Sequence, residues 1–414
     1  MTCNPEGHDS ARMPETSQVP EVAASSFPKL ALQTPEPTAF GHGWISGISS
    51  AILGIAALGT IICFRFPGLT VIELRGHYPV ELIRGLLHVL MVTSFLLGTI
   101  SLCLRRNKFS GLVGIGTVLL AGLLGGSTVE IGGDIQNTWL GLDWFVLNLM
   151  LYSAVYVPLE RFFALRPEQP TFRREWTTDL SYFFLNSILV QILGLLTMQP
   201  AMTLLNWARI PAVVSFLSGL PILVQAVVCI LSADLTQYWV HRAFHQVPLL
   251  WKFHAIHHSA ESMDWLAGSR LHLVDAVATR SLTYVPLFLL GFSQPAIVIY
   301  VVVVVIQATF IHANVRWQFA PLQRWIATPC FHHWHHSAEP AAIDKNFSVH
   351  TPLWDRLFGT WYMPGRWPAS YGLCESYDVP SGWFRQFLYP FRSLLTARNK
   401  TPRKPNLNRK VPGE

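Results

Sequence analysis

Long apolar runs separated by short polar segments fill most of the chain after its first forty residues. An α-helix rises about 1.5 Å per residue, so roughly 20 apolar residues are needed to cross the hydrocarbon core of a bilayer. Most of the runs reach or approach this length, and the glycine-rich third run is the shortest. The pattern therefore predicts an all-α protein, a polytopic transmembrane helical bundle. Its predicted spans cover residues 44–64, 85–104, 111–126, 142–159, 180–202 and 221–240.

A further apolar region, residues 282–311, is interrupted by Pro286, Gly291 and Pro295. Proline and glycine kink or end helices, so this region does not read as one regular helix. It is long enough for one kinked span, or for a helical hairpin that enters and leaves on the same side of the membrane.

The composition agrees with a membrane protein. Hydrophobic residues make up 51% of the 414 residues and charged residues 13%, whereas charged residues are about 25% of a typical soluble domain. The six cysteines have no pair spacing, so no disulfide framework is indicated. We attribute the net charge of +6 to loop arginines that set membrane topology, and expect no nucleic-acid partner.

Loop charges predict the orientation, because Lys and Arg favour the cytoplasmic side. Basic loops follow the second and fourth predicted spans, and acidic residues follow the third. Only the loop with Arg65, Arg75 and Arg84 disagrees. Residues 1–41 are polar and proline-rich, which predicts a disordered cytoplasmic tail. Residues 366–414 form a basic tail that we expect on the cytoplasmic side, near anionic lipid headgroups.

Histidines gather in three short clusters in the second half of the chain. Within each cluster they are three or four residues apart, which places them on one face of a helix and directs them to a common point. Eight imidazoles exceed the need of a tetrahedral zinc site, and no Cys-x-x-Cys or His-Glu-x-x-His accompanies them, so two metal ions fit the count better. The eight are His241, His245, His254, His257, His258, His332, His335 and His336.

These clusters can share a site only if all of them reach one face of the membrane. The first continues the sixth predicted span and the second follows after Pro248, whereas the third lies beyond residues 282–311. A single crossing there would separate the ligands by a bilayer thickness, so we favour the hairpin. The prediction is a helical cap at the cytoplasmic face that carries the histidines.

Asp234 lies inside the sixth predicted span, seven residues before His241 and two turns away on the same face. A carboxylate at membrane depth is costly and usually marks a function or a buried partner. One interpretation is that Asp234 accepts the free ring N–H of a metal-binding histidine. The other is a structural polar contact with another helix.

The three clusters, in the order His-x3-His, His-x2-His-His and His-x2-His-His behind a predicted transmembrane helix, resemble the fatty acid hydroxylase and sterol desaturase superfamily. The flanking segments 234–242, 328–332, 344–347 and 354–360 agree, and the resemblance covers residues 142–361. It implies a membrane di-iron oxidase that uses two Fe ions and O2 to hydroxylate or desaturate a lipid. It also implies an electron donor of cytochrome b5, ferredoxin or similar type.

The family's histidine boxes map onto the eight clustered histidines named above. His272 and His312 fall where many members keep extra histidines, so the resemblance implies that both are further ligands. His333 sits at a variable position of its box and projects about 100° away from His332 on a helix, so it is left out.

The expected domains are the tail 1–41, N-terminal transmembrane helices 42–141, a catalytic domain 142–365 and the tail 366–414. The N-terminal helices are expected to pack against the catalytic bundle or to lengthen a lipid-facing surface, and a role in binding substrate or a partner stays open. Sterol-like or fatty-acyl lipids rank first as substrates and carotenoids or alkylglycerols second, on family breadth alone. Two other classes stay open. A histidine-lined metal transporter would place its ligands along a path at membrane depth, whereas these clusters gather at one interface. A membrane haem protein would need one axial histidine per helix, which adjacent histidine pairs suit poorly.

Overall fold

The computed structural model describes residues 42–133, 140–188, 190–319, 321–373 and 377–396. The described residues form helices and loops without a named strand, which confirms the all-α fold. The predicted tail 1–41 and the end of the basic tail lie outside them. The chain divides into two compact units, residues 1–62 with 80–129, and residues 63–79 with 130–414.

Five helices are long and apolar enough to cross a membrane. They are α1 (Trp44–Arg65), α3 (Val80–Leu104), α5 (Leu142–Phe162), α9 (Ile222–Gln246) and α11 (Leu273–Leu290). Two shorter apolar helices, α4 (Phe109–Leu123) and α12 (Gln294–Phe310), accompany them. All but one of the predicted spans therefore correspond to a single apolar helix.

The exception is the predicted span 180–202. Its residues are divided between α6 (Trp176–Ile188) and α7 (Val190–Leu204), of 13 and 15 residues. Residue 189, between the two helices, lies outside the described residues, so the continuous span 180–202 stays a prediction. Within the described residues, α7 packs along α11.

The first unit is built on close contacts between small residues. Gly98 of α3 lies opposite Gly111 of α4, where an added Cβ would come within 3.3 Å of the Gly111 carbonyl oxygen. Ser50 of α1 and Ser94 of α3 exchange hydrogen bonds, each hydroxyl donating to the other's carbonyl oxygen at 2.7 Å. Small residues let helix backbones approach closely where lipid provides no hydrophobic driving force.

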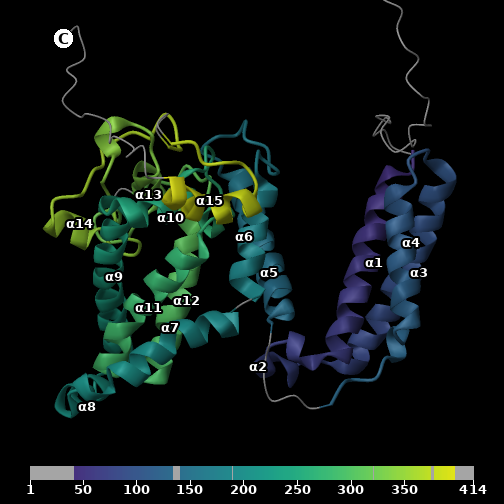
Figure 1. The fold of residues 1–414 in the computed structure, drawn as a ribbon, viewed down its shortest axis with the longest axis horizontal. Helices are drawn as coiled ribbons and strands as arrows, with labels where there is room; N and C mark the ends of the chain where they lie inside the picture. The colour runs from purple at the N-terminus through teal and green to yellow at the C-terminus, as the bar shows by residue number, and fades with distance from the viewer. Residues whose placement is uncertain (1–41, 134–139, 189, 320, 374–376, 397–414) are drawn as a thin grey trace, which may run out of the picture. The chain divides into compact units, whose positions relative to one another are not determined.

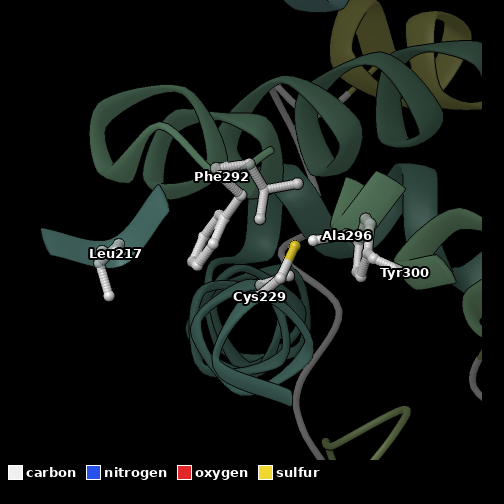
Figure 2. Packing of buried hydrophobic residues seen from close by; sticks show 7 residues of the cluster. Leu217, Cys229, Phe292, Ala296 and Tyr300 are labelled. Atoms are coloured by element: carbon white, nitrogen blue, oxygen red, sulfur yellow. The ribbon is translucent and has the colours of Figure 1, made fainter. Parts of the chain in front are cut away.

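In the second unit, α9 packs against both α11 and α12 (Figure 1). A cluster of buried apolar side chains joins these helices to α8 (Pro211–Ser218). Figure 2 shows Cys229 of α9 beside Ala296 of α12, and Tyr300, Leu217 and Phe292 belong to the same cluster. This packing fixes the position and direction of α9, and therefore the position of its last two turns, where His241 and His245 lie.

Residues 282–311 form the helical hairpin that the sequence favours. α11 ends at Leu290, and Gly291 follows in the left-handed region at φ 68°, a conformation that glycine adopts without strain. α12 then begins with Pro295 in its first turn, where the missing N–H costs nothing. His272, before α11, and His312, after α12, therefore lie at the same end of the pair.

Candidate metal centre

The first two histidine clusters follow one another around a tight break in the chain. His241 and His245 occupy the last two turns of α9. Val247 is extended, as expected before a proline, and Pro248 starts α10 (Pro248–His258). His254, His257 and His258 lie at the end of this short helix, so α10 turns them back toward the end of α9.

The third cluster lies on α13 (Pro329–His335), with His336 directly after it. The Thr328 hydroxyl caps this helix by accepting the N–H of Phe331, and Pro329 occupies its first turn. His312 approaches separately, two residues after the end of α12.

Nine histidines form two adjacent groups. In each group the ring nitrogens that could bind a metal lie within 4.8 Å of one another, and every residue is buried. Across the groups, the rings of His258 and His336 are stacked at 4.4 Å. The first group is His241, His245, His254, His258 and His335, and the second is His257, His312, His332 and His336.

Nitrogen separations within the groups match those around a metal ion. The Nε2 atoms of His241 and His254 are 3.0 Å apart, as are those of His312 and His332. Those of His257 and His312 are 3.4 Å apart. Imidazoles bound about 2.1 Å from one ion at angles of about 90–110° have nitrogens roughly 3.0–3.4 Å apart.

The outward-facing Nδ1 atoms are fixed by oxygen acceptors. The Nδ1–H of His241 donates to the Phe347 carbonyl oxygen at 2.6 Å, and that of His335 donates to the Lys345 carbonyl oxygen at 2.8 Å. The Nδ1 of His254 lies 2.6 Å from a carboxylate oxygen of Asp275. Such partners hold the ring in one tautomer and leave the Nε2 lone pair free for a metal.

Two rings of the second group, those of His257 and His312, are fixed by carbonyl groups. The Nδ1–H of His257 donates to the Arg270 carbonyl oxygen at 3.2 Å, and that of His312 to the Ala308 carbonyl oxygen at 2.7 Å. His333, which the family boxes leave out, lies with its Nδ1 2.9 Å from the Tyr371 hydroxyl and its Nε2 3.3 Å from the His312 carbonyl oxygen. It therefore helps to hold the backbone of His312.

Several inward-facing nitrogens have no partner among the described residues. The Nε2 atoms of His245, His258 and His335 are buried and make no hydrogen bond. A buried polar atom without a partner costs free energy, so this arrangement is what a metal-binding set requires. Burial lowers the pKa of His312 to about 4 and that of His335 to about 3, which keeps both rings neutral and able to bind a cation.

Two buried carboxylates organise the loop that orients the first group. Asp355 accepts the backbone N–H groups of Phe347 and Ser348 at 2.7 and 2.8 Å. Asp234 accepts those of Val349, His350 and Thr351, at 2.9 to 3.2 Å. Both carboxylates are completely buried. They therefore support the loop whose Phe347 carbonyl oxygen meets His241.

A buried ionic network supports the second group. Asp179 of α6 binds both Arg173, at 2.6 Å, and Arg270. Arg173 also pairs with Asp264 at 2.7 Å, and Arg270 pairs with Glu175 at 2.9 Å. Because the Arg270 carbonyl oxygen accepts from His257, the network fixes one of the acceptors that orient the histidine rings.

Nine of the ten histidines expected as ligands lie in the two groups, and His272 does not. Its Nδ1 accepts the N–H of Val274 at the start of α11, and its Nε2–H donates to the Phe387 carbonyl oxygen at 3.1 Å. Both ring nitrogens are thus used in packing, so a metal-binding role for His272 does not agree with the structure.

The interpretation that Asp234 accepts the ring N–H of a metal-binding histidine does not agree with the structure. Asp234 binds backbone N–H groups, whereas Asp275, in the first turn of α11, lies 2.6 Å from the Nδ1 of the metal-binding ring of His254. The sequence analysis missed Asp275. Its acidic side chain at the start of an apolar helix was the one signal available.

Comparison with known proteins places this site in a family. Residues 226–360 match the family model described as fatty acid hydroxylase. The chain is 29% identical over 282 residues to the ornithine lipid hydroxylase OlsE of Rhizobium tropici, which covers 66% of this chain and 82% of that protein.

Other relatives align over shorter stretches. The chain is 30% identical over 159 residues to an alkylglycerol monooxygenase of Danio rerio, covering 38% of this chain and 35% of that protein. It is 30% identical over 132 residues to a Delta(7)-sterol 5(6)-desaturase of Leptosphaeria maculans, covering 32% and 35%. These two alignments span about a third of each relative's length. No solved structure matches the chain.

Proposed function

Because this chain belongs to the fatty acid hydroxylase and sterol desaturase superfamily, we propose that it is a membrane-embedded di-iron oxidoreductase that hydroxylates or desaturates a lipid with O2. The observation that carries this proposal is the pair of buried groups of five and four histidines. Nine buried imidazoles at one end of α9 exceed the needs of one ion and divide into two sets, each of which is sufficient for an ion.

Two features of the nine histidines fit iron: their donor atoms and the ring nitrogens that have no hydrogen-bond partner among the described residues. Imidazole is a common ligand for iron, and the unpartnered Nε2 atoms of the first group are aimed at a shared centre. When bound, two irons would supply the redox chemistry that lets O2 attack an unactivated C–H bond. The chain's own residues orient the rings and exclude water from the centre.

The two other classes have less support. A metal transporter would need ligands spaced along a path through the membrane, whereas these nine gather at one end of the α9, α11 and α12 bundle. A haem protein needs axial ligands facing each other across a planar ring, and nitrogens 3.0 Å apart leave no room for one.

The proposed substrate is a lipid with a saturated hydrocarbon chain and a polar headgroup. The relative that aligns over 82% of its length is named for hydroxylation of an ornithine lipid, and another is named for alkylglycerol oxidation. We therefore place fatty-acyl lipids ahead of sterols, and hydroxylation ahead of desaturation. Electrons would come from a cytochrome b5-type, ferredoxin-type or similar donor.

We also propose that the centre and the C-terminus face the cytoplasm, where such a donor is available. The basic loops and the basic tail support this orientation. In the same scheme, residues 142–365 are the catalytic domain and residues 42–141 are additional transmembrane helices.

Lipid mass spectrometry tests the reaction. Lipids from a deletion strain are compared with those from the same strain carrying either the wild-type chain or the His257→Ala variant. Gain of one oxygen atom in a lipid species with the wild-type chain alone is the expected result. Loss of two hydrogen atoms would identify a desaturase, and identical lipids in all three strains would refute the proposed activity.

A further inference from the structure

Helix α15 (Trp383–Thr396) lies against the metal-binding cap and at the level where a membrane span begins. It packs on α10, which carries three of the histidines, and on α6 (Figure 1). Its Phe387 ring is stacked on His272 at 5.1 Å, and its Phe387 carbonyl oxygen accepts the His272 Nε2–H. Because His272 caps the first turn of the apolar helix α11, α15 lies at the depth of that helix's end.

The inner face of α15 is covered by the protein. Gln386 and Pro390 are buried on this face. Phe253 of α10 joins the packing, with its ring 5.0 Å from His272 and 5.7 Å from Phe391. Phe253 precedes His254 directly, so this contact connects α15 to the helix that presents the second histidine cluster.

Next to the covered face, α15 presents an apolar edge that the described residues leave open. Phe384 is 62% exposed and Phe391 40% exposed. They are seven residues apart and therefore lie on one line along the helix. Exposed phenylalanines on a helix beside a membrane span need an apolar surrounding, since exposing them to water is unfavourable.

The third face of α15 is basic. Arg385 and Arg392 are exposed and follow Phe384 and Phe391 by one residue each. Since each residue turns a helix by about 100°, the two arginines lie beside the apolar edge, on the opposite side of the helix from Phe387, whose ring lies on His272. A helix in the plane of a membrane interface has this arrangement, with apolar side chains toward the acyl chains and arginines among the headgroups.

We propose that α15 is an in-plane membrane helix, which inserts Phe384 and Phe391 among the acyl chains and places Arg385 and Arg392 among anionic headgroups. His272 is the residue that pins this helix to the start of α11. The metal-binding cap is thereby held against the bilayer surface, through Phe253 and α10. The inference requires only that α11 spans the membrane, and holds whatever reaction the centre performs.

Fluorescent probes on single cysteines test the proposal in the full-length protein, with the native cysteines replaced. Phe384→Cys and Arg385→Cys each receive a polarity-sensitive fluorophore in nanodiscs of phosphatidylcholine and phosphatidylglycerol. Quenching by nitroxides on lipid acyl chains is compared with quenching by aqueous iodide. Val227→Cys, on the exposed apolar face of α9, is the control for lipid contact, and Ser381→Cys, before α15, is the control for water contact.

The expected result is quenching of the Phe384→Cys probe by lipid nitroxides, with an iodide quenching constant at least about three-fold below that of the Arg385→Cys probe. Equal access of iodide to both probes without lipid quenching would overturn the proposal. So would a Phe384→Cys probe that neither quencher reaches, because another protein or a second copy of the chain would then cover this edge.

A second measurement uses the wild-type chain, in case the cysteine-free background does not fold. The protein is reconstituted with phosphatidylcholine that carries a photoreactive group in its acyl chain, and the adducts are mapped by mass spectrometry. Adducts on the peptide with Phe384 and Phe391, beside those on α9, support the in-plane position. Adducts on α9 without any on α15 would exclude it.

Discussion

Replacing Asp275 with Asn removes a buried carboxylate that lies 2.6 Å from a metal-binding ring. Asp275 is 2% exposed, and its oxygen lies 2.6 Å from the Nδ1 of His254. The Thr279 hydroxyl donates to the other carboxylate oxygen at 3.0 Å, which fixes the carboxylate in place. The variant keeps the shape of the side chain but loses its negative charge.

The expected loss is confined to the five-histidine group. Removing an outer partner of a ligating histidine lowers metal affinity by about 10-fold to 100-fold, or roughly 1.4–2.8 kcal/mol. We place Asp275→Asn at the upper end, because the contact is short, charged and buried. The four-histidine group has its own carbonyl acceptors at Arg270 and Ala308 and should retain its ion.

Metal content after dialysis against a graded series of chelator concentrations measures this effect. Asp344→Asn is the matched control, since the Asp344 carboxylate lies 3.5 Å from the Nδ1 of His245 and its side chain is 34% exposed. Solvent screening should make the loss from this variant much smaller. Metal retention by Asp275→Asn equal to wild type, or a larger loss from Asp344→Asn, would refute the reasoning.

Three further predictions concern neighbouring residues. His312→Ala should lower the amount of bound metal, whereas His272→Ala should leave bound metal unchanged and reduce the melting temperature. Metal analysis and thermal unfolding of both variants check this prediction, and equal metal loss from the two variants would contradict it. Asp355→Asn should destabilise the fold and weaken metal binding, because it frees the loop whose Phe347 carbonyl oxygen orients His241; unchanged melting and metal content would contradict this. The pKa values of about 4 for His312 and 3 for His335 lie below the ordinary 6.5, so both rings bind a proton on unfolding below pH 6.5. The stability of the metal-free protein should therefore be full above pH 6.5 and fall toward pH 4, by about 1.4 kcal/mol per pH unit for each ring. A denaturation profile that stays flat over this pH range would contradict the prediction.

The sequence predicted features that depend on short-range pattern. The apolar runs located the long helices, because the length needed to cross a bilayer is fixed by the helical rise. The spacing of His241 and His245 predicted a shared face, and Gly291 with Pro295 predicted the turn between α11 and α12. The requirement that the three histidine clusters lie at one membrane face then favoured the hairpin over a single crossing.

Features set by tertiary packing could not be predicted in the same way. Asp275 contacts His254 across 21 residues, and Asp234 contacts a loop more than 110 residues later. Nothing local distinguishes these carboxylates from one another. His272 had the expected position for a ligand, but its ring nitrogens are used by Val274 and Phe387, a contact that depends on where α15 lies.

The neighbours of the predicted span 180–202 have the same origin. The apolar residues of this span are numerous enough to cross a bilayer. The first turn of α6 nevertheless carries the buried Asp179, which pairs with Arg173 and Arg270. That ionic network fixes α6 beside the metal centre, while α7 follows α11. Hydropathy alone contains no information on either constraint.

The most direct test of two metal ions held by nine histidines is the iron content of the purified wild-type chain, measured per polypeptide together with its visible absorption spectrum. The account predicts about two irons per chain without haem absorbance. One iron per chain, a haem spectrum, or only weakly held metal that exchanges freely would contradict it.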